Sequence, residues 1–144
     1  MKRSERIRQL KKLVDQDAER EAIKLAQIQT QLAQEKVKID QLVEFKKDYL
    51  YRSVNERGRV NPTQLQDLEK FTRQLDYSIS QQHKYIEMVD QHLDAQRSRW
   101  LVLHNKVKAY AQWIDKLCQE ELVDERRNEQ KILDEFVINQ WQRK

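Results

Sequence analysis

Residues 65–117 read LQDLEKFTRQLDYSISQQHKYIEMVDQHLDAQRSRWLVLHNKVKAYAQWIDKL, and the spacing within this stretch decides the fold. Apolar or aromatic side chains recur at alternating intervals of three and four residues, with no glycine or proline between them. The sixteen positions of this stripe are Leu65, Leu68, Thr72, Leu75, Ile79, Gln82, Ile86, Val89, Leu93, Gln96, Trp100, Leu103, Val107, Tyr110, Ile114 and Leu117. Only Thr72, Gln82 and Gln96 are polar. A repeat sustained in this way predicts a long helix that packs along one narrow face against a second helix.

A looser stripe of the same period comes before it and predicts the partner helix. Its positions are Ile7, Lys11, Val14, Ala18, Glu21, Leu25, Ile28, Leu32, Glu35, Ile39, Leu42, Lys46 and Tyr49. Nine of these thirteen are apolar or aromatic, and the four charged positions cost stability while they favour one register. We expect this first helix over about residues 4–57, with Ser4 as a possible N-cap.

The segment between the two stripes, NERGRVNPT, combines a helix stop with a helix start. Gly58 can adopt the left-handed conformation that ends a helix. Asn61 is a favourable N-cap, Pro62 suits the first helical position, and Gln64 stands where a capping box has its second member. A turn is therefore expected over residues 58–61 and a second helix over about 62–141.

So short a connection forces two helices into an antiparallel hairpin. The predicted fold is all-α, a single coiled-coil domain over residues 1–144 that is monomeric, in which facing residues have numbers that sum to about 119. By this count Ile7 lies near Gln112 and Trp113, and the pairing with the first helix ends at about Leu117. The stripe also fades there.

The residues beyond Leu117 carry a second apolar set, which consists of Leu122, Ile132, Leu133, Phe136, Val137 and Trp141. Because no part of the first helix is left to cover them, we expect a docking surface for a partner. A frayed tail and self-association are the alternatives. Five aromatic residues also lie off the stripes, namely Phe45, Phe71, Tyr77, Tyr85 and Trp113. Partly exposed aromatic side chains are usual anchors of interaction sites, although they also widen a seam.

The composition argues against several functional classes. The chain has 144 residues, 36% of them charged, with one Gly, one Pro and one Cys. A single glycine excludes nucleotide-binding loops, the three histidines have no metal-ligand spacing, and Cys118 has no adjacent histidine. We therefore expect no enzymatic activity, no metal and no cofactor. The basic residues cluster only near the N-terminus, so no nucleic-acid interface is expected. Neither a signal peptide nor a membrane-spanning segment is predicted.

The segment DYLYRSVNERGRVNPTQLQDLEKFTRQLD, following a first helix of this length, resembles the FliJ family of flagellar export proteins. The later segment RRNEQKILDEFVINQW, especially Asp134-Glu135-Phe136, resembles the same family. The resemblance covers nearly the whole chain. It implies a soluble stalk or adaptor of the flagellar type III export apparatus, located in the cytoplasm and peripherally associated with the inner membrane.

The resemblance also implies partners, which are the hexameric export ATPase FliI, the export gate protein FlhA and export chaperones. By position, the residues implied to contact the gate are Leu42, Phe45, Tyr49, Phe71, Leu75, Ser78 and Gln82. Ser78 and Gln82 stand where the family has alanine and histidine. The residues implied to contact the ATPase are Ile7, Leu10, Leu13, Leu122, Ile132, Leu133 and Phe136. The equivalent stalk of a virulence secretion system and an unrelated coiled-coil scaffold are the alternative functions.

Overall fold

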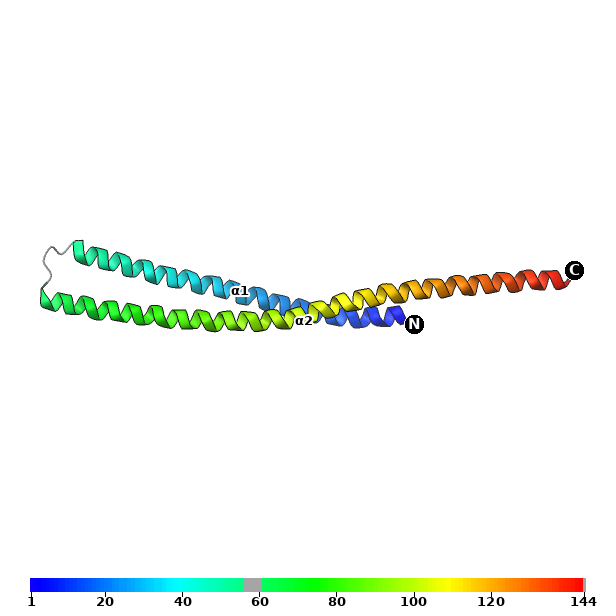
Figure 1. The fold of residues 1–144 in the computed structure, drawn as a ribbon, viewed down its shortest axis with the longest axis horizontal. Coiled ribbons are helices and arrows are strands. Elements are labelled where there is room, and N and C mark those ends of the chain that lie inside the picture. Colours follow the sequence, from blue (N-terminus) through cyan, green and yellow to red (C-terminus); the bar gives the residue numbers. More distant parts are fainter. Residues whose placement is uncertain (56–60, 144) are drawn as a thin grey trace. The chain divides into compact units, whose positions relative to one another are not determined.

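The computed structural model describes residues 1–55 and 61–143, and these residues form two long helices and no strand. Helix α1 (Arg3–Asn55) and helix α2 (Pro62–Arg143) pack against each other as a helical hairpin (Figure 1). The predicted all-α fold is therefore confirmed. Gly58 and most of the expected turn lie outside the described residues.

Helix α2 begins with the capping box that the sequence predicts. The backbone N–H of Gln64 donates to the Asn61 Oδ1 at 2.8 Å, and the Asn61 N–H donates to the Gln64 Oε1 at 3.3 Å. The Asn61 carbonyl accepts the first helical hydrogen bond, from Leu65 at 3.0 Å. Two of the backbone N–H groups that a helix N-terminus leaves unpaired are thus satisfied locally, which explains why α2 starts at Pro62.

The start of α1 differs from the prediction. Ser4 does not cap the helix, because α1 already begins at Arg3 and the Lys2 carbonyl accepts a hydrogen bond from the Arg6 N–H at 3.3 Å. The Ser4 side chain is buried and bonded to α2. A serine near a helix start is a good cap by local preference alone, but here a partner distant in the sequence takes its hydroxyl.

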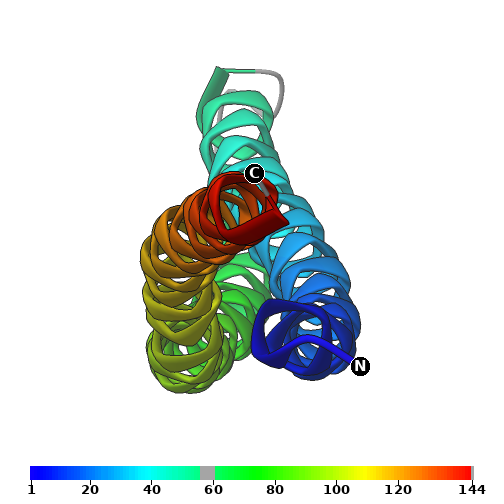
Figure 2. The same ribbon diagram turned by 90° about the vertical axis from the view of Figure 1, so that its right-hand side faces the viewer.

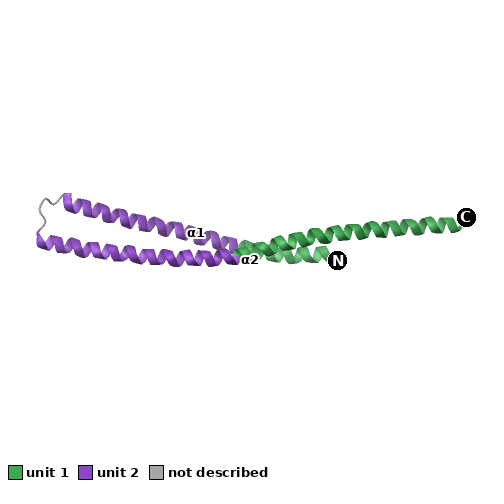
Figure 3. Cartoon of the chain, in the orientation of Figure 1, with its two compact units in different colours: residues 1–20, 100–144 green, residues 21–99 purple. Residues whose placement is uncertain are grey.

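Contacts divide the chain into two compact units, which are described separately (Figure 3). Unit 2 comprises residues 21–99. Its core contains Ile28 and Leu32 of α1 with Val89 and Leu93 of α2, and Leu25 and Ile86 pack at its edge. The two helices of this unit run antiparallel, because Glu35 bonds to Gln82 while the earlier Glu21 bonds to the later Gln96. The numbers of both pairs sum to 117, close to the expected 119.

Unit 1 comprises residues 1–20 and 100–144. Its core is formed by Ile7, Ile114 and Leu117, with Tyr110 and Cys118 packed against them. Ser4 of α1 bonds to Glu121, and Lys2, which precedes α1, binds Glu125, so pairing does not end at Leu117 as expected. Ile7 packs further along α2 than Gln112 and Trp113. The count from the turn assumed one constant sum near 119, whereas the numbers of Ile7 and Ile114 sum to 121 and those of Ser4 and Glu121 sum to 125.

Beyond these contacts, α2 continues without a neighbour in unit 1. Figure 1 shows its orange-to-red end extending past the N-terminal residues of α1, and Figure 2 shows the same end of α2 facing the reader. All residues from Leu122 to Arg143 are exposed. Elsewhere the predicted stripes are confirmed, since each predicted position except Leu65 is buried or half-buried.

Candidate functional site

Three aromatic side chains form a cluster across the two helices of unit 2. The ring centroids of Tyr49 and Phe71 are 4.4 Å apart. Phe45 lies edge-on to Phe71 at 6.4 Å and stacks with Tyr49 at 6.5 Å. Tyr49 and Phe71 are half-buried, whereas Phe45 is 52% exposed. The cluster therefore widens the helix–helix contact and also presents an aromatic edge to solvent.

The other residues that the resemblance assigned to the gate contact divide into two groups. Leu75 is buried, Leu42 is half-buried, and Gln82 is half-buried and hydrogen-bonded to Glu35. Ser78 is exposed. The outward surface at this site comes from Phe45 and Ser78, while Leu75 and Gln82 mainly hold the two helices together.

The polar residues inside the stripes pair with one another within unit 2. The Gln82 side-chain amide donates to both the backbone carbonyl of Glu35, at 3.2 Å, and its carboxylate. Gln96 makes the same two bonds to Glu21. These amide donors favour the ionised carboxylates and hold the pKa of Glu35 and the pKa of Glu21 below their usual value. Four of the positions that break the predicted stripes therefore bond to one another across the seam, and a fifth, Lys46, binds Asp76 of α2.

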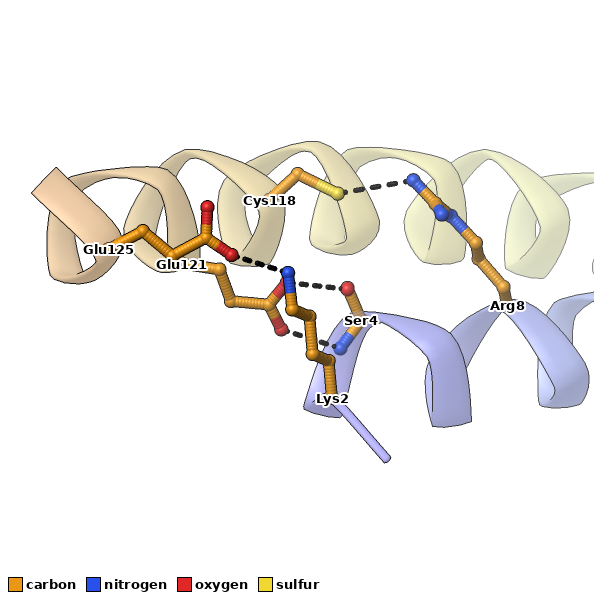
Figure 4. Close-up of polar contacts among 6 residues, drawn as sticks. All are labelled: Lys2, Ser4, Arg8, Cys118, Glu121 and Glu125. Atoms are coloured by element: carbon orange, nitrogen blue, oxygen red, sulfur yellow. Dashed lines mark hydrogen bonds and ion pairs between the residues drawn. The ribbon is translucent and has the colours of Figure 1, made fainter.

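A polar contact closes the paired part of unit 1 (Figure 4). The Glu121 carboxylate accepts hydrogen bonds from the Ser4 hydroxyl at 2.6 Å and from the Ser4 backbone N–H at 2.9 Å. Glu121 therefore satisfies one of the free N–H groups at the start of α1, and its negative charge lies near the positive end of the helix dipole. The hydrogen bonds from Ser4 lower the pKa of Glu121.

Two further contacts flank this pair. The Lys2 ammonium binds the Glu125 carboxylate, which raises the pKa of Lys2. The Arg8 guanidinium lies 3.2 Å from the Cys118 Sγ. Sequence reasoning missed all three contacts of Figure 4, because their partners are more than 100 residues apart and the stripe was expected to end at Leu117.

The residues that the resemblance assigned to the ATPase are mostly exposed. Ile7 is the exception, because it lies in the core of unit 1. Leu10, Leu13, Leu122, Ile132, Leu133 and Phe136 are exposed. Val137 and Trp141 are exposed as well, and so are Val123 and Ile138, which the sequence reading did not single out.

The apolar set at the end of α2 lies on a different face from the stripe. Leu133 follows Leu117 by sixteen residues, which at about 100° per residue places it roughly 160° around the helix. Leu122, Phe136 and Val137 lie within about 60° of Leu133 by the same count. The side of α2 that packs against α1 in unit 1 is therefore not the side that carries these residues.

Other kinds of site are not seen in the part of the chain that the structure describes. No three His, Cys, Asp or Glu side chains there are grouped so that they could hold a metal ion. Within residues 1–55 and 61–143, neither helix has an apolar stretch long enough to cross a membrane. The exposed apolar and aromatic side chains are a candidate protein-binding site, because such side chains are usual anchors of protein interfaces.

Comparison with known families agrees with the resemblance that the sequence shows. The family model described as "Flagellar FliJ protein" matches residues 2–144. This chain belongs to the FliJ family. Membership makes it a component of flagellar type III protein export, and the FliJ family is a non-enzymatic part of that apparatus. Neither a curated protein nor a solved structure was found to match this FliJ-family chain.

Proposed function

We propose that this FliJ-family chain is a cytoplasmic stalk and adaptor that binds the export ATPase FliI and the export gate protein FlhA. It acts at the inner-membrane export apparatus as a peripheral component. The observation that carries the proposal is the exposed apolar face at the end of α2, which no other described residue covers. A face of this kind on an unpaired helix is a helix-in-groove ligand.

The FliI contact uses Leu122, Leu133, Phe136 and their apolar neighbours. An adaptor that binds the assembled ring better than the single subunit shifts FliI toward the ring by mass action. The chain itself then needs no catalytic group, and the increased turnover belongs entirely to FliI.

The test is FliI hydrolysis in the presence of the purified chain. We expect the wild-type chain to raise FliI turnover, and Leu133→Ala with Phe136→Ala to lose most of this effect. Each apolar anchor of an interface contributes about 2 kcal/mol or more, so the double variant should bind at least tenfold more weakly. Lys131→Ala with Glu135→Ala is the matched control, because these residues lie on the opposite face of the same turns. Unchanged turnover with the wild-type chain would disprove the FliI contact.

The FlhA contact uses the aromatic cluster of Phe45, Tyr49 and Phe71. The exposed edge of Phe45 beside Ser78 supports this assignment, because an aromatic side chain that is half exposed still has apolar area to bury. We expect Phe45→Ala with Phe71→Ala to weaken binding of the FlhA cytoplasmic part by at least about tenfold.

The control for the cluster is Tyr51→Ala with Tyr77→Ala. These two aromatic residues are also exposed, but their positions in the repeat point away from the helix–helix seam. Binding should be unaffected by the control and helicity should be nearly unaffected by either variant. If the cluster variant bound FlhA as well as the control did, the aromatic site would be wrong.

A further inference from the structure

The two flanks of the seam in unit 2 differ in chemistry. One flank consists of the residues that directly precede alternate stripe positions, and we call it the amide flank. It contains Lys24, Gln31, Lys38 and Phe45 of α1, and Phe71, Ser78, Tyr85, His92 and Arg99 of α2. The Gln31 amide donates to the Tyr85 hydroxyl at 2.9 Å, and Phe45 meets Phe71. These two contacts show that both rows meet on the same side of the seam.

Over residues 24–45 and 71–99 the amide flank lacks carboxylates, and so does the row next to it, which carries Asp48 and Asp67 beyond these ranges. That row contains Gln27, Gln34 and Gln41 of α1, and Gln74, Gln81, Met88 and Ala95 of α2, all exposed. Flank positions of a coiled coil are often Glu or Lys, because ion pairs there set the partner and the register. Instead, polar stripe positions pair inside the seam, and over several turns this flank carries basic and uncharged side chains only.

The opposite flank of unit 2 and its adjoining row are mixed in charge. They contain six carboxylates, those of Asp40, Glu69, Asp76, Glu87, Asp90 and Asp94, and four basic residues, Lys36, Lys47, Arg73 and Arg97. An acidic partner would therefore meet carboxylates there, whereas it meets none on the amide flank over residues 24–45 and 71–99. The difference does not reflect the chain as a whole, which has 24 acidic residues.

The basic groups of the amide flank remain accessible. The Lys24 and Lys38 ammonium groups contact Glu21 and Glu35 of their own helix at 3.4 Å and 3.1 Å, yet their side chains are 60% and 61% exposed. An ammonium group has three donors, so each can also bind a carboxylate from outside. Beside them, Ile23, Ala26, Gln27, Thr30, Gln31 and Gln34 line a shallow groove on α1.

We infer that the amide flank binds an acidic amphipathic helix, which lies along the exposed side chains of this flank on α1 and α2 and reaches the aromatic cluster. Phe45 and Phe71 belong both to the cluster and to the flank, so the two surfaces are continuous. The inference rests on the proposed function, because the helix is taken to belong to the partner of the cluster. Its apolar edge would meet Tyr85 and Met88, and its carboxylates would face Lys24 and Lys38.

The experiment measures binding of the FlhA cytoplasmic part to the full chain at several salt concentrations. The flank variant carries Gln81→Glu with Met88→Glu, and the control carries Ser80→Glu with His83→Glu on the opposite flank. Both pairs add two negative charges at exposed positions of the same helix, so they change the net charge equally. We expect the flank variant to bind about tenfold more weakly, by repulsion and lost apolar contact, and the control to bind like the wild type.

A photo-cross-linking residue placed at Gln81 or at Ser80 gives a second readout that does not depend on affinity. Cross-links to FlhA from position 81 and not from position 80 support the inference. If the flank variant bound FlhA like the wild type while Phe45→Ala with Phe71→Ala still lost binding, the inference about the amide flank would be wrong. The aromatic site would then remain supported. No binding by the wild-type chain would overturn both.

Discussion

Ser4 and Glu121 show how one residue pair can end a helix contact. The Glu121 carboxylate accepts two hydrogen bonds from Ser4, and these bonds hold the pKa of Glu121 below its ordinary value of 4.5. The pKa values of Glu21 and Glu35 are lowered as well, and the main cause is the hydrogen bond that each carboxylate accepts from a glutamine amide. A carboxyl group whose pKa is lower in the folded state stabilises that state only while it is ionised.

The residue-scale prediction concerns pH. The contribution of these three carboxylates is present above their unfolded pKa, near 4.5, and is lost as the pH falls through their lower folded values. We expect the midpoint of thermal unfolding, followed by circular dichroism, to fall as the pH drops below about 4.5. Glu121→Gln should lower the midpoint at pH 7 and make it less sensitive to acid. Glu135→Gln, at an exposed position, serves as the control, and equal behaviour of the two variants would contradict the prediction.

At the scale of the element, α2 has two parts with different neighbours. Up to Glu125 its residues contact α1 or the preceding Lys2 within unit 1, and from Leu122 onward every described residue is exposed. Helical propensity and side-chain pairs along the helix surface support the last turns, because tertiary contacts do not. The hydrogen bond that the Gln130 side-chain amide donates to the Asp134 carboxylate, at 3.2 Å, is one such pair.

The element-scale prediction compares two truncations. A chain that stops after Arg126 should keep the wild-type unfolding midpoint, because it retains every contact between α1 and α2 described in unit 1, and it should no longer stimulate FliI. A chain that stops after Leu117 also loses Glu121 and Glu125, so its midpoint should fall. Circular dichroism measures the unfolding midpoint, and the FliI assay measures the stimulation of hydrolysis. A large loss of stability on stopping after Arg126 would show that the exposed end belongs to the core.

At the scale of the whole molecule, the stripes of α1 and α2 pack against each other within a single chain. Nearly every stripe position is buried or half-buried without a second copy. A parallel dimer scaffold would need the same positions for its own seam. We therefore expect light scattering to give a mass near that of one chain, 17.6 kDa. A mass of twice this value would contradict the monomer. If the chain that stops after Arg126 then had the mass of one chain, the apolar end of α2 would be the site of the association.

The sequence predicted most of the fold because the deciding signals are local or periodic. The alternating stripe and the Asn61–Gln64 capping box need only neighbouring residues, and both are confirmed. Ser4 was predicted wrongly as a cap because its partner is 117 residues away. The aromatic residues Phe45 and Phe71 were singled out as lying off the stripe, but the sequence could not show that they meet each other and Tyr49.

The sequence by itself determined the two helices, their antiparallel pairing, the FliJ family and the residues that could anchor partners. A heptad repeat and a helix stop carry that information in the order of residues alone. Only the tertiary structure decided which polar residues bond across the seam, how far α1 follows α2 in unit 1, and which rows of α1 and α2 meet on one side of unit 2. These features depend on side chains from distant parts of the chain, and the pairing of the two helices brings them together.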